Sequence, residues 1–205
     1  MNLLILVTAI FVIVTYFSFG FSDVMLAQKA VYMVTEYATP IQNIINSPNM
    51  CVITTFQLPS VIKYFGGKEF FYKLTITKVE DDDPATPNYV VFALSSRGKK
   101  STVIAAKKIE TDAEVHLLSE INPETNELSA FTEYPAEIVL DPQGNGIVDS
   151  IYLAKQVNAG KDYVFLMTCS TIKNTCKKNE TKIGDYILQN LGEFNNESIC
   201  IKASG

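Results

Sequence analysis

Short apolar runs alternate with polar turns along most of the chain after residue 30. Runs of four to eight residues rich in Val, Ile, Thr, Tyr and Phe, bounded by Gly, Pro, Asn and Asp, are typical of β-strands. We predict strands over 31–37, 51–57, 68–79, 88–95, 102–109, 113–118, 128–134, 137–140, 147–153, 162–172 and 182–190. The last two are expected to form a hairpin around a polar turn. A short helix is expected over 23–30.

Alternation is clearest in the second half of the 68–79 run. Leu74 and Ile76, with Tyr72, are predicted on one face, and Lys73, Thr75 and Thr77 on the other. No stretch of helical length after residue 30 has a convincing 3.6-residue period. Regular short strands separated by frequent turns favour an all-β domain, either a sandwich or an up-and-down barrel.

The first twenty residues differ from the rest. No charged side chain occurs from Leu3 to Phe19, and Ser18 and Gly20 are small residues at the −3 and −1 positions of a cleavage site. We interpret 1–20 as a signal peptide and 21–205 as one domain. The alternative is a single membrane anchor, because roughly 18 apolar residues can span a bilayer. With cleavage, the mature protein is expected to be secreted and free of the membrane.

Secretion changes the meaning of the four cysteines. An even number of cysteines in an oxidising compartment predicts two disulfides, for which three connectivities are possible. We favour Cys51–Cys200, which would tie the tail to an early strand, and Cys169–Cys176, which would close a local turn. The spacings do not suit zinc. Asn179 and Asn196 each begin a glycosylation sequon.

Composition and charge narrow the function classes. The chain has 205 residues and a formal net charge of −5, which disfavours nucleic-acid binding. It has one histidine, no Gly-x-Ser-x-Gly elbow and no phosphate-binding glycine loop. We therefore expect no enzymatic activity and no cofactor or metal. The domain is expected to be a monomer.

Both ends of the chain resemble a known family. The run Tyr163–Cys169, the later run Gly184–Gln189 and the final Cys200 resemble the last two strands and stapled tail of lipocalins. The run Val31–Tyr37 followed by Cys51 resembles their first strand and the cysteine after it. The likeness is to salivary lipocalins of blood-feeding arthropods, of the tick histamine-binding type and the triabin and nitrophorin type. The chain departs from the family pattern in having no Trp.

This resemblance implies a single antiparallel up-and-down β-barrel of about eight strands, with a short N-terminal helix and a disulfide-tethered tail. It also implies a small ligand in the barrel, such as a biogenic amine or a lipid mediator. The alternatives are a triabin-like module that inhibits a host protease or receptor, and a haem-binding lipocalin with His116 on the iron.

An amine pocket needs inward carboxylates surrounded by aromatic side chains. If residues 31–37 are a strand, Tyr32 and Glu36 share one of its faces. The candidate ligand-binding residues are Tyr32, Glu36, Phe71, Phe92, Glu133 and Phe165.

Overall fold

The computed structural model describes residues 2–48, 51–80, 88–98, 102–121, 128–144 and 148–191, and within α1 it describes side chains from Ser22 onward. The elements in chain order are α1 (Asn2–Ile45), β1 (Cys51–Gln57), β2 (Ile62–Lys63), the 3-10 turn η1 (Phe65–Gly67), β3 (Glu69–Phe70), β4 (Tyr72–Val79), β5 (Asn88–Ser96), β6 (Val103–Thr111), β7 (Glu114–Ile121), β8 (Leu128–Glu133), β9 (Glu137–Leu140), β10 (Ser150–Asn158), β11 (Lys161–Cys169) and α2 (Thr175–Asn190).

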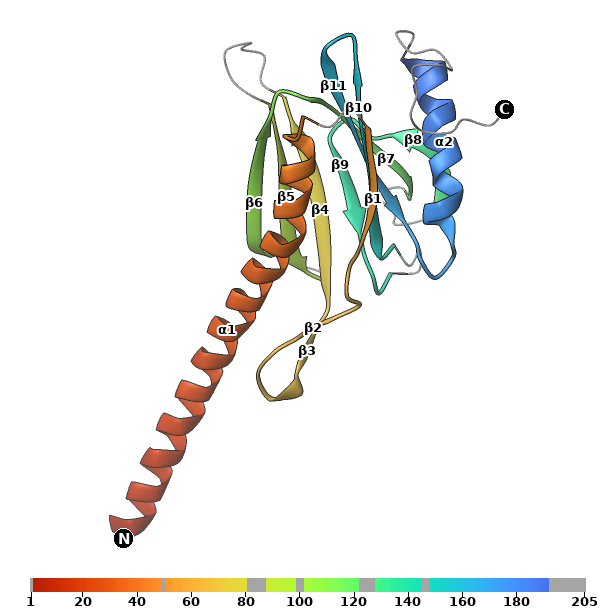
Figure 1. The fold of residues 1–205 in the computed structure, drawn as a ribbon. Coiled ribbons are helices and arrows are strands. Elements are labelled where there is room, and N and C mark those ends of the chain that lie inside the picture. The colour runs from red at the N-terminus through yellow and green to blue at the C-terminus, as the bar shows by residue number, and fades with distance from the viewer. Residues whose placement is uncertain are drawn as a thin grey trace.

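The strands form two open sheets and a small two-stranded pair of β2 with β3 (Figure 1). The larger sheet has the order β1-β10-β11-β7-β8, and the second has the order β6-β5-β4-β9. Among the described strands no ladder joins the two sheets into a closed barrel, and β7 pairs with β11 in parallel. The prediction of a mainly β domain is confirmed, whereas the single up-and-down barrel is wrong.

The space between the two sheets is filled by side chains. On β4 the inward residues Tyr72, Leu74 and Ile76 are all buried, which confirms the predicted alternation. They share one apolar core with inward residues of β5, β6, β7, β9, β10 and β11 and with the C-terminal half of α1. The interior that would hold a ligand in a barrel is therefore occupied by packed side chains.

Helix α1 takes the place of two predicted elements. It runs without interruption from Asn2 to Ile45, so the strand predicted over 31–37 is wrong, and the short helix predicted over 23–30 is part of a longer one. Its buried positions recur every three to four residues along one stripe, namely Ala30, Met33, Val34, Ala38, Ile41 and Ile45. The β-branched residues of 31–37 favour a strand locally. Burial of the apolar stripe in the core stabilises the helix instead. Pro40 is exposed on the helix.

The C-terminal half of α1 lies along β6 and β5, and its N-terminal half extends beyond the sheets (Figure 1). The predicted cleavage point after Gly20 lies within this helix, and removal of 1–20 stays a prediction. Across the helical residues whose side chains the structure describes, no segment is long and apolar enough to cross a membrane.

Helix α2 covers the opposite face of the five-stranded sheet (Figure 1). Its Ile183 and Ile187, four residues apart, pack with Leu118, Phe165 and Met167. The predicted strand over 182–190 is therefore wrong, and the hairpin is a strand followed by a helix.

The predicted Cys169–Cys176 disulfide is present and ties the end of β11 to the first turn of α2. Cys51 is also disulfide-bonded, and its predicted partner Cys200 lies outside the described residues. Of the two sequons, Asn179 lies within α2, and Asn196 lies outside the described residues. Glycosylation stays a prediction at both.

Candidate functional site

The six predicted ligand-binding residues do not form one site. Tyr32 is 64% exposed and Glu36 is exposed, one helical turn apart on the outer side of α1. Phe71 is 45% exposed, whereas Phe92 is fully buried between the sheets. These four residues therefore line no common cavity.

Glu133 and Phe165 do come together, around His116. The His116 ring is buried and stacks on Phe165 with ring centroids 5.1 Å apart. His116 Nδ1 lies 2.8 Å from Glu133 Oε1. A carboxylate only accepts, so Nδ1 carries the hydrogen. The other ring nitrogen, Nε2, lies 3.1 Å from Glu114 Oε1.

Two further contacts complete this group, which we call the His116 cluster: His116, Glu114, Glu133, Lys161 and Tyr186. Lys161 Nζ lies 2.5 Å from Glu114 Oε2, and Tyr186 donates its hydroxyl hydrogen to Glu133 Oε2. The cluster joins β7, β8 and β11 to α2. It is a polar network around a buried histidine, and its Glu114, Glu133 and Lys161 side chains are partly exposed.

The electrostatics of the cluster favour charged carboxylates. The hydrogen bond from His116 lowers the pKa of Glu133, against the opposing effect of burial, and the hydroxyl of Tyr186 adds to the lowering. Burial alone would raise the pKa of Glu114, but the hydrogen bond from Lys161 and the positive charge of His116 bring it below its ordinary value of 4.5. Burial, together with the Glu133 carboxylate, raises the pKa of Tyr186.

Haem ligation by His116 would require a change in this network. Each ring nitrogen faces a carboxylate, so iron would have to displace Glu133 or Glu114. Within the described part of the chain, no group of three or more His, Cys, Asp or Glu side chains is placed to hold a metal ion.

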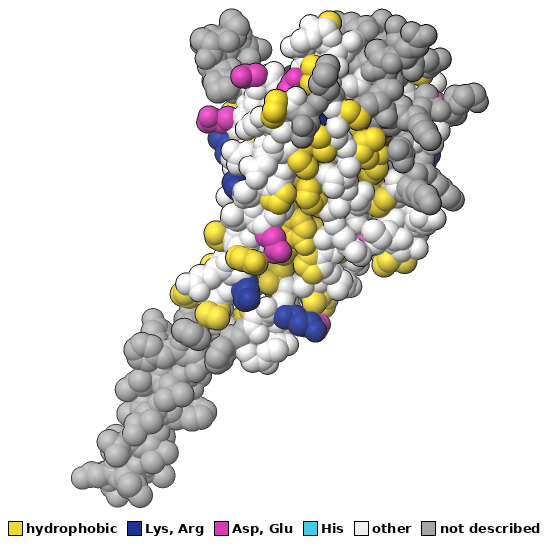
Figure 2. All heavy atoms as spheres, in the orientation of Figure 1, with side chains coloured by type: hydrophobic (Ala, Val, Ile, Leu, Met, Phe, Trp, Pro, Cys, Tyr) yellow, Lys and Arg dark blue, Asp and Glu magenta, His cyan; other side chains and the backbone are white. Residues whose placement is uncertain are grey.

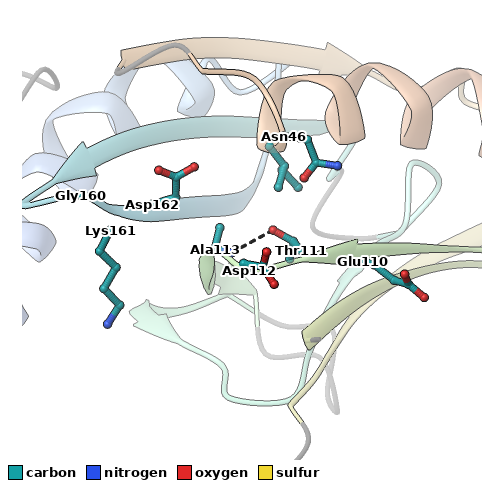
Figure 3. Close-up of a pocket in the computed structure, with 9 residues that line it drawn as sticks. Asn46, Glu110, Thr111, Asp112, Ala113, Gly160, Lys161 and Asp162 are labelled. Atoms are coloured by element: carbon teal, nitrogen blue, oxygen red, sulfur yellow. Dashed lines mark hydrogen bonds between the residues drawn. The ribbon is translucent and has the colours of Figure 1, made fainter. Parts of the chain in front are cut away.

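An open hollow of about 670 Å³ lies where α1 ends, and we call it the α1 hollow (Figure 3). The end of α1, the β6–β7 turn and the β10–β11 turn supply its lining: Ile45, Asn46, Glu110, Thr111, Asp112, Ala113, Gly160, Lys161 and Asp162. Only Ile45 and Ala113 are apolar with a side chain, and none is aromatic. Three carboxylates against one ammonium group make the lining acidic.

The charged groups of the α1 hollow differ in whether a side chain of opposite charge lies next to them. Lys161 is directed to Glu114, and Glu110 pairs with Lys108 at 3.2 Å. In Figure 3 the Glu110 and Lys161 side chains point to opposite sides, with Asp112 between them. Asp112 is exposed. The negative charge is therefore nearest the middle of the hollow.

One buried cation, Lys155, contacts two of the residues that line the hollow, Ile45 and Asp162. Lys155 of β10 is fully buried, and its Nζ donates to the carbonyl oxygens of Ile45 at 2.7 Å and Ser47 at 2.6 Å. It also lies 2.7 Å from Asp162 Oδ2. Lys155 thus satisfies carbonyls that α1 leaves unpaired at its C-terminus, where cations are favoured.

A second hollow, of about 460 Å³, lies near the other end of β1 and includes Tyr37, Asp149 and Ile172. Asp149 is buried and accepts from the Thr171 backbone N–H at 2.8 Å. Its other oxygen accepts from the Thr171 hydroxyl. Both oxygens of Asp149 accept hydrogen bonds from Thr171, which follows β11. We therefore assign Asp149 a structural role and not a ligand-binding one.

Sequence reasoning named His116 only as an alternative haem ligand and missed Glu114, Lys155 and Tyr186. Glu114 and His116 are two apart in a predicted strand, so their shared face was a usable signal. Lys155 interrupts an apolar strand, which marks a buried charge with a partner. Tyr186 is missed because its segment is predicted as a strand. The α1 hollow joins three distant turns, and no local pattern indicates it.

No family model, curated protein or solved structure matches the chain. Any function therefore has to follow from the geometry of the chain itself.

Proposed function

We propose that the chain is a secreted binding protein that takes a small cationic ligand, an amine, in the α1 hollow. The observation that carries this proposal is the acidic lining of the hollow, where Asp112 is exposed near the middle. The other two carboxylates of the lining, Glu110 and Asp162, each have a lysine partner, and Lys161 is paired with Glu114. The chain binds and releases its ligand unchanged in this proposal.

The size and chemistry of the lining select the ligand class. A volume of about 670 Å³ lies within the range of small-molecule sites. A lipid mediator would need an apolar lining, which this hollow lacks, so the amine is the better fit. Without an aromatic wall there is no cation–π cage for a ring-bearing amine. A flexible diamine or polyamine, with charge at both ends, suits the lining best.

Secretion is supported by three features. The apolar leader 1–20 and the two sequons are signals in the sequence, and the Cys169–Cys176 disulfide is compatible with an oxidising compartment. An extracellular amine scavenger would operate in that compartment.

Calorimetric titration of the full chain with spermidine at low ionic strength tests the proposal. Because the carboxylates are solvent-exposed, we expect weak binding that falls with added salt. Asp112→Asn should weaken spermidine binding about fivefold, since one exposed charge pair contributes up to about 1 kcal/mol. Glu69→Gln, in an exposed pair with Lys63 away from the hollow, is the matched control. Absence of binding heat, or equal binding by both variants, contradicts the proposal.

A second candidate is a protein-binding module, as in the triabin-like alternative. It is favoured by exposed apolar side chains on α1, namely Val24 and Val31, each 54% exposed, and Tyr32. Figure 2 displays hydrophobic side chains around the point where α1 leaves the sheets. Here the outer face of α1, and not a cavity, would contact the partner. A photo-crosslinker at position 32 should then capture one defined protein, and the same group at position 69 should not.

A further inference from the structure

His116 sits between two carboxylates, and only one of its protonation states satisfies both. Glu133 Oε1 is 2.8 Å from Nδ1 and Glu114 Oε1 is 3.1 Å from Nε2. A neutral imidazole has one N–H, so in either tautomer one carboxylate faces a ring lone pair. The imidazolium form has a hydrogen on each nitrogen, so it donates to Glu133 and forms an ion pair with Glu114.

The geometry at Nε2 also favours the charged ring. Nε2 is buried and makes no aligned hydrogen bond, although Glu114 Oε1 is close. The distance is that of an ion pair, while the direction is not that of a hydrogen bond. An ionic attraction depends less on angle than a hydrogen bond does, so the short distance is sufficient for it. A neutral ring would leave a buried nitrogen unsatisfied, which is costly.

The cluster connects this proton to α2. Glu133 receives a hydrogen bond from His116 on one oxygen and from Tyr186 of α2 on the other. The Tyr186 ring also meets the His116 ring edge-on, with centroids 6.3 Å apart. A change in charge at His116 therefore acts on Glu133, whose hydrogen bond from Tyr186 holds α2 on the sheet.

The groups around His116 come from every element packed against it. Glu114 on β7 is paired with Lys161 on β11, and Tyr163 on β11 stacks near the ring. Glu133 on β8 is within the electrostatic influence of Lys78 on β4. With a neutral ring, these two lysines are the counter-charges that the described side chains leave to the two carboxylates.

We propose that α2 is a pH-sensitive cover, which docks more firmly on the five-stranded sheet when His116 is protonated. Deprotonation loosens the contact through Glu133 and Tyr186. The helix covers an apolar face that includes Phe165 and Met167, so its loosening would make that face accessible. Histidine is the residue type best suited to change charge near neutral pH, so a histidine at this contact makes the docking of α2 sensitive to protonation.

The flanking carboxylates set the lower limit of this range. The pKa values of Glu114 and Glu133 are lowered in the folded chain. A lowered pKa means that these groups stabilise the fold above their unfolded value and cease to do so as the pH falls through the folded value. Docking is therefore expected to be firmest at mildly acidic pH and to weaken again below the ordinary glutamate value of 4.5.

Amide hydrogen exchange of the full chain at pH 6 and pH 8, corrected for intrinsic rates, tests the proposal. His116 is the single histidine of the chain, so no other histidine can titrate in this range. We expect α2 amides to be protected roughly fivefold more at pH 6, as for one charge-assisted contact. The amides of β10 are the internal reference and should change little.

Two variants separate protonation from general destabilisation. In Glu114→Gln the amide can donate to Nε2 of a neutral ring, so protection of α2 at pH 8 should rise toward its value at pH 6. In His116→Gln the dependence between pH 6 and 8 should disappear. Glu120→Gln is the control: it weakens the contact of Glu120 with Lys182 of α2 and should lower protection equally at both pH values.

Three results would overturn the proposal. One is equal corrected protection of α2 at pH 6 and pH 8 in the wild type. Another is the same pH dependence in His116→Gln as in the wild type. The last is a change of equal size in α2 and β10, which would indicate global stability and not a moving cover.

Discussion

The two helices of this protein are held by different physical means. Helix α1 inserts a stripe of apolar side chains into the core between the sheets, and Ile41 and Ile45 are almost completely buried there. Helix α2 contributes Ile183 and Ile187 to a smaller cluster and relies on Tyr186, Lys182 and a disulfide for the rest. The first helix is part of the core between the sheets, whereas the second is attached by a smaller apolar cluster, polar contacts and a crosslink.

The helix ends show the same difference. The C-terminus of α1 is satisfied by a buried lysine, Lys155, which donates to the carbonyl oxygens of Ile45 and Ser47. The N-cap of α2 is Asn174, whose side chain makes no capping hydrogen bond, and no acidic residue lies in the first turn. Its start is fixed covalently by Cys176. Burial therefore secures α1, whereas the start of α2 is held by a crosslink that reduction would break, and the pH dependence proposed above would act on the rest of its attachment.

Among substitutions that probe these two attachments, Lys155→Met should have the largest effect. It removes the buried ammonium group and leaves the Ile45 and Ser47 carbonyls and Asp162 without their partner. Breaking a buried pair of this kind should lower the free energy of unfolding by about 3 kcal/mol. Urea denaturation followed by circular dichroism measures it.

Lys63→Met is the matched control, because Lys63 is exposed and its pair with Glu69 spans 3.9 Å. Its effect should stay below about 0.5 kcal/mol. A loss for Lys155→Met as small as the control's would mean that water replaces the ammonium group, and that the end of α1 is open to solvent.

Removing the Cys169–Cys176 disulfide with paired serines should have an intermediate effect. The crosslink spans a sequence separation of 7, and a loop this short contributes about 2 kcal/mol in the chain-entropy view. Because the crosslink fixes the start of α2, loss of protection should be concentrated in α2. Hydrogen exchange with mass spectrometry locates it. Equal loss across β10 and β11 would contradict the division between core and cover.

Tyr186→Phe should have the smallest effect. The change removes one hydroxyl donor to Glu133 and keeps the ring, which typically costs about 1 kcal/mol. Protection should fall in α2 and remain unchanged in α1. Tyr134→Phe, on a half-buried tyrosine packed against the other core, is the comparison variant. An equal loss of α2 protection in both variants would argue against the His116 cluster as the attachment point.

Most strands could be predicted from local pattern, because their alternation and turn residues are local properties. β1 matches the predicted 51–57, and β9 matches the predicted 137–140. The two strands that are wrongly predicted, over 31–37 and 182–190, both lie in helices. In both segments the local composition is β-rich or polar and does not favour a helix. Apolar residues three or four apart stabilise the helix there, but only by packing against a sheet, and the local sequence does not show that sheet.

The closed barrel failed for a different reason. The spacing of strands along the chain does not specify which strands pair. The structure pairs β7 with β11 in parallel, whereas an up-and-down order contains only antiparallel neighbours. The candidate site shows the same limit. Glu133 and Phe165 were among the predicted residues and do meet, but through a histidine and a helix whose positions depend on tertiary pairing.

The order of strands also has a consequence for how the chain folds during synthesis. β4, β5 and β6 are successive antiparallel strands and can pair as they emerge from the ribosome. In contrast, β1 must wait for β10, and β7 must wait for β11. Sequence-distant pairings carry a larger loop-closure cost and slow folding. We therefore expect the five-stranded sheet to form only near the end of translation, with β1 exposed as an unpaired strand until then.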